Sequence, residues 1–153
     1  MKGINLNGTI KTYSSVPKTW GNILGVNYMS DEELKGLGFY DVVIPTTKQS
    51  EQLGDIYFDE ANEVFTYPVE SRTYTQTVAE LKEQKIANLK DIYNRELAKT
   101  DWYIIRSQEG IAAPQEIIDA RTALRTECAT HETNINAKTT KASVIDYELP
   151  IFI

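Results

Sequence analysis

The chain has 153 residues, enough for one medium-sized domain or two small ones. One quarter of the residues are charged and the net charge is −6, a composition typical of folded proteins and not of disordered ones. Residues 1–75 carry 6 basic and 10 acidic side chains, and residues 76–153 carry 10 and 12. Neither half has the basic surface that nucleic-acid binding requires.

The cysteine content and the hydropathy of the chain bear on its compartment. A single cysteine, Cys128, cannot form an internal disulfide bond and fits a reducing compartment. No apolar run approaches the roughly 18 residues that a membrane helix needs. Lys2 is not followed by the hydrophobic stretch of a signal peptide. We therefore expect a protein that stays in the cytoplasm where it is made, or enters a particle assembled there, without membrane contact.

The first half of the chain is predicted to be rich in β-structure. Residues 4–13 alternate apolar and polar side chains around Asn7-Gly8, the dipeptide that suits a two-residue hairpin turn. Ser30 and Glu33 have the spacing of a capping box, in which each side chain binds the backbone N–H of the other residue. This pattern predicts the start of a short helix.

Two further segments of the first half, residues 39–44 and residues 56–67, predict a strand and a second hairpin. Aromatic side chains are concentrated here, and successive residues of a strand point to opposite faces of a sheet. Some rings should therefore lie outside the core, and Tyr40, Tyr57 and Tyr67 are candidates for a protein interface. The alternative, that the rings cover a small domain on both faces, fits the sequence equally well.

The second half of the chain is predicted to be helical. Thr77 and Glu80 form another capping box, and apolar residues then recur with a period near 3.6 over about 22 residues. Thr100 is expected to cap a short second helix that ends at Gly110, and Pro114 to stand at the first position of a third.

A run of uncommon residues in a fixed order spans the junctions of these helices. It consists of Thr100, Asp101, Trp102, Tyr103, Arg106, Pro114, Arg121, Leu124 and Arg125. From about residue 81 to residue 125, the chain resembles the C-terminal domain of bacteriophage tail assembly chaperones and tail-fibre assembly proteins. The resemblance implies a non-enzymatic phage protein that helps to assemble or attach a tail or tail fibre by binding other proteins.

The same resemblance allows a permanent virion component, such as an adaptor, collar or fibre-anchor subunit. In either case the expected partners are phage tail, fibre or other virion proteins, and no cofactor is expected. The expected location is the host cytoplasm during assembly, or the virion itself. Because phage components usually work as symmetric oligomers, we also expect a homo-oligomer.

The motif also predicts how the helices pack. We expect a helical hairpin centred on Trp102, in which the first and third helices meet through Leu89, Tyr93, Leu97, Ile117 and Leu124. Arg121 and Arg125 lie one helical turn apart, and they either clamp a partner carboxylate or pair with an internal acid. We favour the internal pair, because a guanidinium fork suits an ion pair between helices. Its candidate acids are Asp101, Asp119 and Glu96.

Catalytic and metal-binding alternatives are weak. Cys128 and His131 share one helical face, as a thiolate–imidazole pair would, with Glu127 or Glu132 to orient the ring. No oxyanion loop is evident nearby, so a packed cysteine beside a surface histidine is the favoured interpretation and a small hydrolase the disfavoured one. The acidic cluster within residues 55–63 lacks the pattern of a calcium loop. We expect no catalytic, cofactor or metal site.

These patterns predict an α+β protein in three parts: a β-rich domain (residues 1–75), a helical hairpin (76–140) and an apolar tail (141–153). The tail ends in a run of large apolar side chains: Leu149, Ile151, Phe152 and Ile153. Because such a run is an aggregation hazard when free, we expect it to dock as an added strand. The acceptor would be the β-rich domain or, by preference, a neighbouring subunit.

Overall fold

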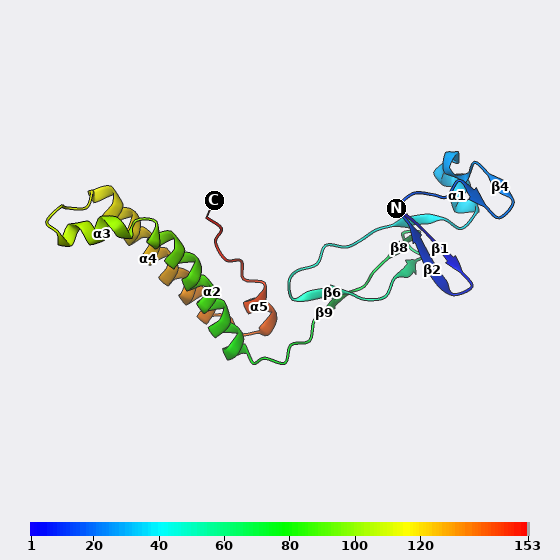
Figure 1. The fold of residues 1–153 in the computed structure, drawn as a ribbon. Coiled ribbons are helices and arrows are strands. Elements are labelled where there is room, and N and C mark those ends of the chain that lie inside the picture. The colour runs from blue at the N-terminus through cyan, green and yellow to red at the C-terminus, as the bar shows by residue number, and fades with distance from the viewer. Residues whose placement is uncertain (153) are drawn as a thin grey trace. The chain divides into compact units, whose positions relative to one another are not determined.

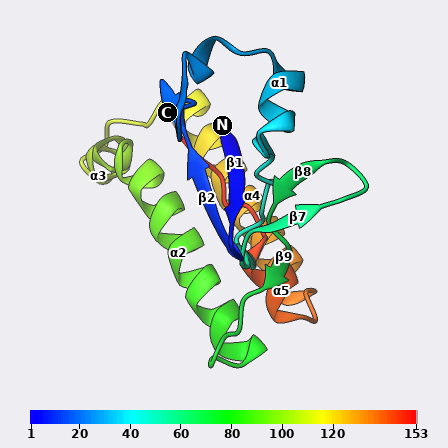
Figure 2. The same cartoon turned by 90° about the vertical axis from the view of Figure 1, so that its right-hand side faces the viewer.

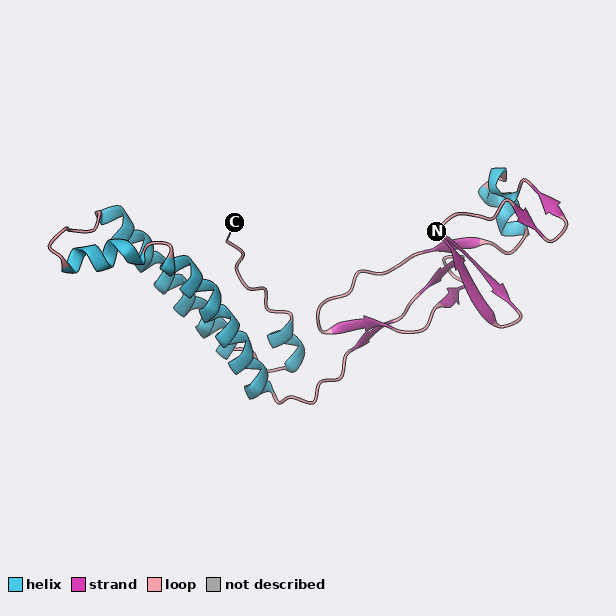
Figure 3. Ribbon diagram, in the orientation of Figure 1, coloured by secondary structure: helices cyan, strands magenta, loops and turns pink. Residues whose placement is uncertain are grey.

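The computed structural model describes residues 1–152 and has an α+β fold, with strands in the first half and helices in the second (Figures 1 and 3). The chain divides into two compact units after Arg72, which we call the β unit and the helical unit. The predicted fold class is therefore confirmed. The division differs in detail from the expected one, since residues 73–75 and 141–152 belong to the helical unit.

A five-stranded sheet forms the centre of the β unit, with the order β2-β1-β5-β8-β7. The pair β5–β8 is parallel, and the other pairs are antiparallel. The strands are β1 (Lys2–Leu6), β2 (Thr9–Tyr13), β5 (Tyr40–Val42), β7 (Tyr57–Asp59) and β8 (Val64–Thr66).

Both predicted hairpins are present. In the first, Asn7 and Gly8 have φ angles of 53° and 89°, as a type I′ turn requires, and the register places Leu6 opposite Thr9. The second hairpin joins β7 to β8. The predicted strand over residues 39–44 is shorter than expected and is confined to β5.

Shorter elements complete the β unit. They are β3 (Thr19–Trp20), β4 (Ile23–Leu24), the 3₁₀ turn η1 (Val26–Tyr28), α1 (Asp31–Gly36), β6 (Glu51–Leu53) and β9 (Val69–Ser71). The capping box of α1 is confirmed: the Glu33 N–H donates to Ser30 Oγ (3.3 Å), and the Ser30 N–H donates to the Glu33 carboxylate (2.8 Å). The hydrogen bonds that the Ser30 N–H and hydroxyl group donate to that carboxyl group lower its pKa.

The two faces of the sheet carry different apolar clusters, because alternate side chains of a strand point to opposite sides. On one face Ile4 packs with other buried residues: Val26, Leu34 and Phe39. On the other, Tyr40, Phe58 and Phe65 pack ring against ring, with centroids 4.7–6.3 Å apart. Tyr40 is thus half-buried in a cluster, and Tyr67 is also half-buried, whereas Tyr57 is exposed. Of the three tyrosines predicted for an interface, Tyr57 is thus the one with an exposed side chain, at 46%.

Gly3 is placed where the backbone of β1 passes close under an aromatic ring. A Cβ atom at this position would lie 2.7 Å from Cδ2 of Phe65 and 3.0 Å from Cγ2 of Val42. We therefore expect Gly3→Ala to lower the free energy of unfolding of the β unit by roughly 1–3 kcal/mol through overpacking. The control is Gly36→Ala in α1, where an added Cβ would meet no atom within 4 Å.

The measurement is urea unfolding followed by the fluorescence of Trp20, in a background in which Trp102 is replaced by phenylalanine. Trp20 packs against the core of the β unit, so it reports on that unit alone. Equal midpoints for the Gly3→Ala and Gly36→Ala proteins would show that the close contact has no energetic weight.

The helical unit contains α2 (Val78–Ala98), α3 (Asp101–Gln108), α4 (Gln115–Asn136) and α5 (Lys141–Ile145). The long helices α2 and α4 run side by side, and the short α3 lies at the turn between them (Figures 1 and 2). The capping box at Thr77 and Glu80 is confirmed. The expected helical hairpin is therefore present.

Helix α4 continues to Asn136, although the β-branched and polar residues from Thr133 onward have low helix propensity. Four threonines of α4 donate their hydroxyl groups to the carbonyl four residues earlier: Thr122, Thr126, Thr130 and Thr133. Each hydroxyl is satisfied within the helix and does not draw the backbone out of it. The burial of Ile135 in the core of the helical unit accounts for the continuation of α4 to Asn136.

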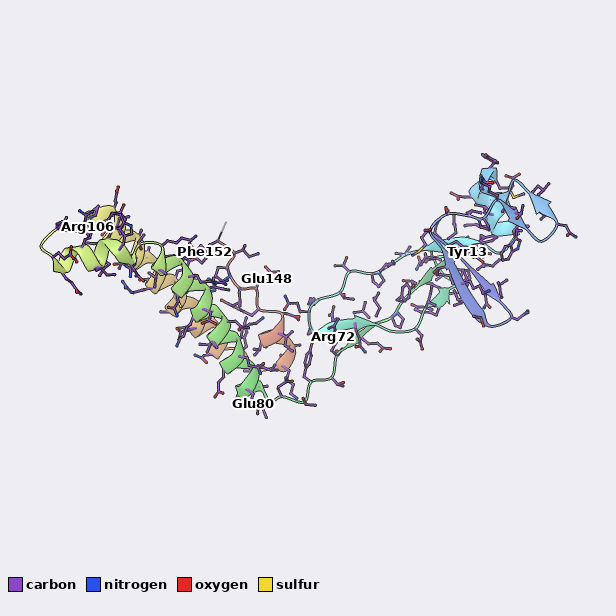
Figure 4. All side chains as sticks on the ribbon, viewed as in Figure 1. Tyr13, Arg72, Glu80, Arg106, Glu148 and Phe152 are labelled. Atoms are coloured by element: carbon purple, nitrogen blue, oxygen red, sulfur yellow. The ribbon has the colours of Figure 1, made fainter. Side chains whose placement is uncertain are left out.

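Leu89, Tyr93 and Ile135 form the buried core of the helical unit. The C-terminal tail packs against this core through Tyr147, Leu149 and Phe152. In Figure 4, Phe152 lies beside the long helices. The tail thus docks on its own helices, and residues 146–152 form no strand. Strand addition to the β unit of the same chain was therefore wrong, because the tail packs its apolar side chains on the helical core. Addition to a neighbouring subunit stays a prediction, and Ile153 lies outside the described residues.

Candidate functional site

Arg121 is the most constrained polar residue of the predicted motif. Its side chain is only 8% exposed. Nη1 donates to the carbonyl oxygen of Leu97 (2.6 Å) and to Oγ1 of Thr100 (2.7 Å), and Nη2 donates to Oδ1 of Asp101 (2.8 Å). One guanidinium group on α4 therefore holds the end of α2 and the start of α3. This arrangement confirms the favoured prediction of an internal ion pair with Asp101.

Thr100 takes part in this network and does not cap α3 with its side chain. It occupies the N-cap position, but its hydroxyl donates to the Leu97 carbonyl (3.1 Å) and accepts from Arg121. Asp101 still lies in the first turn of α3, where a carboxylate is favoured. Pro114 immediately precedes α4, one position before the expected one.

Trp102 does not form the packing centre of the hairpin. Its side chain is 47% exposed, so the prediction of a buried tryptophan was wrong. The core lies further along the hairpin, at Leu89 and Tyr93, and the space at the turn is filled by the Arg121 network. Trp102 instead stacks on Tyr103 with ring centroids 3.8 Å apart.

An apolar surface results at the turn of the helical hairpin. It consists of Trp102, Ile105, Ile111 and Ile118, which are 47%, 61%, 50% and 41% exposed. We call these four residues the hairpin-tip patch. The Arg106 guanidinium lies over the Trp102 ring, 5.3 Å from its centroid, and Figure 4 shows Arg106 on α3 at the end of the helical unit. Trp102 and Ile105 lie three residues apart on α3 and so share one face. Large apolar side chains exposed in this way are typical of a protein-binding surface.

A second apolar surface lies on the β unit. Leu24 and Tyr28 are 80% and 86% exposed, and Ile23 of the same short hairpin is 37% exposed. We call these three residues the β-unit patch. The β-unit patch was not predicted from the sequence, because β3 and β4 are two residues long and give no alternating pattern. The available signal was an apolar pair, Ile23-Leu24, between two glycines.

The other two motif residues near Arg121 have different environments. Leu124 is half-buried against the core of the helical unit. Arg125 is exposed and lines a groove of about 330 Å³ between α2 and α4, together with Lys90, Asn94 and Cys128. Within residues 1–152, Arg125 forms no ion pair. The two arginines are therefore not equivalent.

Cys128 and His131 do not form a nucleophilic pair. The Cys128 thiol lies 3.8 Å from Oε1 of Glu132, whereas Nδ1 of His131 is hydrogen-bonded to the Tyr147 hydroxyl at 2.6 Å. Burial, together with the negative charge of Glu132, raises the pKa of the Cys128 thiol. A raised pKa keeps the thiol protonated and poorly nucleophilic near neutral pH. His131 thus links α4 to the tail, and Cys128 packs against the core of the helical unit.

Clusters of metal-ligating side chains and membrane-spanning helices are both absent from residues 1–152. No group of three or more His, Cys, Asp or Glu side chains in this range is close enough together to hold a metal ion. None of the helices in this range combines the length and apolar character of a membrane span.

Comparisons with known proteins returned nothing: no family model, no curated protein and no solved structure matches this chain.

Tyr93 combines deep burial with an unsatisfied hydroxyl group. The residue is 2% exposed, and its hydroxyl group forms no hydrogen bond of good geometry with residues 1–152; the nearby Glu127 carboxylate offers at most a weak one. Burial raises the pKa of this phenol to about 12, and the nearby charge of Glu127 adds to the rise. We expect Tyr93→Phe to raise the free energy of unfolding of the helical unit by roughly 1 kcal/mol, because it removes an unpaired buried polar group.

The matched control is Tyr147→Phe, which removes the hydroxyl that binds His131. We expect this change to lower the free energy of unfolding by roughly 0.5–1.5 kcal/mol, the usual weight of one hydrogen bond. Urea unfolding followed by circular dichroism gives the free energy of unfolding of both variants. Loss of stability in both variants would mean that the Tyr93 hydroxyl has a partner.

Proposed function

We propose that this chain is a non-enzymatic binding protein of a bacteriophage that helps to assemble or attach a tail or tail fibre. The observation that carries the proposal is the presence of two separate apolar patches, one on each unit. The hairpin-tip patch lies on the helical unit, and the β-unit patch lies on the other. A chain with one binding surface on each of two units is suited to joining two proteins.

The phage assignment rests on the resemblance of residues 81–125 to tail and tail-fibre assembly proteins. The residues that carry the resemblance fall into two groups in the structure. Arg121, Thr100 and Asp101 build the turn of the hairpin, whereas Trp102 and Arg106 are presented on its surface. The same short motif therefore builds the tip and supplies its binding groups, as expected of a module that recognises another protein.

The β-unit patch is the surface that we assign to the tail or fibre protein. Leu24 and Tyr28 are more exposed than any residue of the hairpin-tip patch. Tyrosine is among the side chains favoured at the centres of protein interfaces, because it combines a large apolar ring with a hydroxyl group. A transient assembly factor and a permanent adaptor would both use such a surface.

The test is complementation of a phage from which the coding sequence of this chain is deleted. We expect the deletion to yield particles without complete tails or fibres, and the unaltered chain to restore them. The double variant Leu24→Ser, Tyr28→Ser should fail to restore them, whereas Ile151→Ser, a change at an 87% exposed site outside both patches, should succeed.

Mass spectrometry of the purified restored particles separates the two forms of the proposal. A symmetric copy number identifies a virion adaptor, and absence from the particle identifies a transient chaperone. Intact tails and fibres on particles of the deletion phage would overturn the proposed function itself.

A further inference from the structure

We infer that the hairpin-tip patch is an interface between two copies of this chain, related by a two-fold axis. The inference builds on the proposed function, since it names the partner of one patch and leaves the β-unit patch for the tail or fibre protein. It concerns the tip formed by α3, the loop that follows it and the start of α4.

Helix α3 is only lightly packed within the chain: Tyr103 and Ile104 are half-buried, and Arg121 holds its first residue, Asp101. It has eight residues, and none of them is buried. Isolated helices of this length are marginal in water, and most helices in proteins are stabilised by packing of an apolar face. Trp102 and Ile105 supply such a face, but they are 47% and 61% exposed. A second molecule placed on this face would bury Trp102 and Ile105 as well and add to that packing.

The charges beside the patch identify what that molecule is. Arg106 lies over the Trp102 ring, and Glu109 follows three residues later, on the same side of the helix. Neither side chain forms an ion pair with any of residues 1–152. The exposed side therefore carries one unpaired cation and one unpaired anion next to an apolar surface.

A second copy matches this pattern by symmetry. In a two-fold interface, contacts occur in equivalent pairs, so Arg106 of each copy can meet Glu109 of the other. A purely acidic partner would attract Arg106 but repel Glu109, and a purely basic partner would do the reverse. Four apolar side chains and two ion pairs form a small interface, so we expect a weak dimer with a dissociation constant of roughly micromolar order.

The experiment is light scattering of the purified full-length chain over a concentration series, which gives the dimer dissociation constant. We expect each charge reversal alone, Arg106→Glu or Glu109→Arg, to weaken the dimer about tenfold or more, because like charges then face each other. The double reversal should restore the dissociation constant to within about threefold, because opposite charges face each other again.

Two further variants complete the test. Ile105→Glu places a charge inside the apolar patch and should leave the chain monomeric, whereas Ile151→Glu, at an exposed site away from the patch, should dimerise normally. All sites are on the surface, and circular dichroism checks that each variant is folded. A wild-type chain that is monomeric at every concentration, or a double reversal no better than either single change, would overturn the inference.

The measurement uses this protein alone, so its outcome does not depend on a phage partner. A monomeric chain whose Leu24→Ser, Tyr28→Ser variant still fails in complementation would refute the dimer and leave the proposed function standing. A normal dimer in a chain that the phage does not need would support the dimer and refute the proposed function.

Discussion

Replacement of Arg121 by methionine is expected to lower the free energy of unfolding of the helical unit by roughly 2–4 kcal/mol. The guanidinium group donates three hydrogen bonds from a nearly buried position, and methionine can fill its space but cannot donate. The Leu97 carbonyl and the Thr100 hydroxyl then lose a charged donor. Asp101 is half exposed and can return to water, which keeps the loss below that of a fully buried ion pair.

Arg125→Met is the matched control, since it makes the same chemical change one helical turn further along α4. Arg125 is exposed and unpaired within residues 1–152, so we expect a change within about 0.5 kcal/mol. The loss of unfolding free energy in Arg121→Lys should lie between those of Arg121→Met and Arg125→Met. One ammonium group cannot reproduce the planar guanidinium that reaches α2 and α3 together. Urea unfolding followed by circular dichroism gives all three values, and equal effects at positions 121 and 125 would contradict the structural role of Arg121.

Simultaneous replacement of Leu149 and Phe152 by alanine is expected to destabilise the helical unit by roughly 3–5 kcal/mol. Both side chains pack against the core of Leu89, Tyr93 and Ile135, and the Phe152 ring lies 5.3 Å from that of Tyr93. Their removal uncovers apolar side chains of α2 and α4 to water, which adds to the loss of the tail's own burial.

Ile151→Ala is the control within the same segment, because this residue is 87% exposed between two packed neighbours. We expect its free energy of unfolding to change by less than about 0.5 kcal/mol. Urea unfolding gives the stabilities, and light scattering gives the mass. A double variant that keeps its stability but loses its oligomeric mass would return the tail to the intersubunit role that the sequence first suggested.

The sequence predicted best where a local rule determines the structure. Asn7-Gly8 specifies its hairpin turn, and the capping boxes at Ser30 and Thr77 specify where α1 and α2 begin. These features depend on residues within one turn of each other, so they can be predicted from the local sequence without tertiary information. The helical hairpin and the Arg121–Asp101 pair were also predictable, from spacing and from charge.

The failures concern which apolar residues are buried. Trp102 and Phe152 are both large and apolar, and no local rule states that the first is exposed and the second is packed. The outcome depends on the Arg121 network filling the turn and on the tail covering the core from a distant part of the chain. Alternation likewise sent Phe39 and Tyr40 to opposite faces, but only the fold shows that both faces are covered.

The order of the two units along the chain has a consequence for folding during synthesis. The sheet joins strands distant in sequence, including the parallel pair β5–β8, and such pairing is slow, on a scale of milliseconds to seconds. A helical hairpin forms faster, because most of its contacts are local. The β unit leaves the ribosome first. Translation of the rest takes roughly 4 to 16 s at ribosomal rates of about 5–20 residues per second. The β unit, which folds more slowly, is thus synthesised first. Its sheet can form before the apolar face of α3 leaves the ribosome.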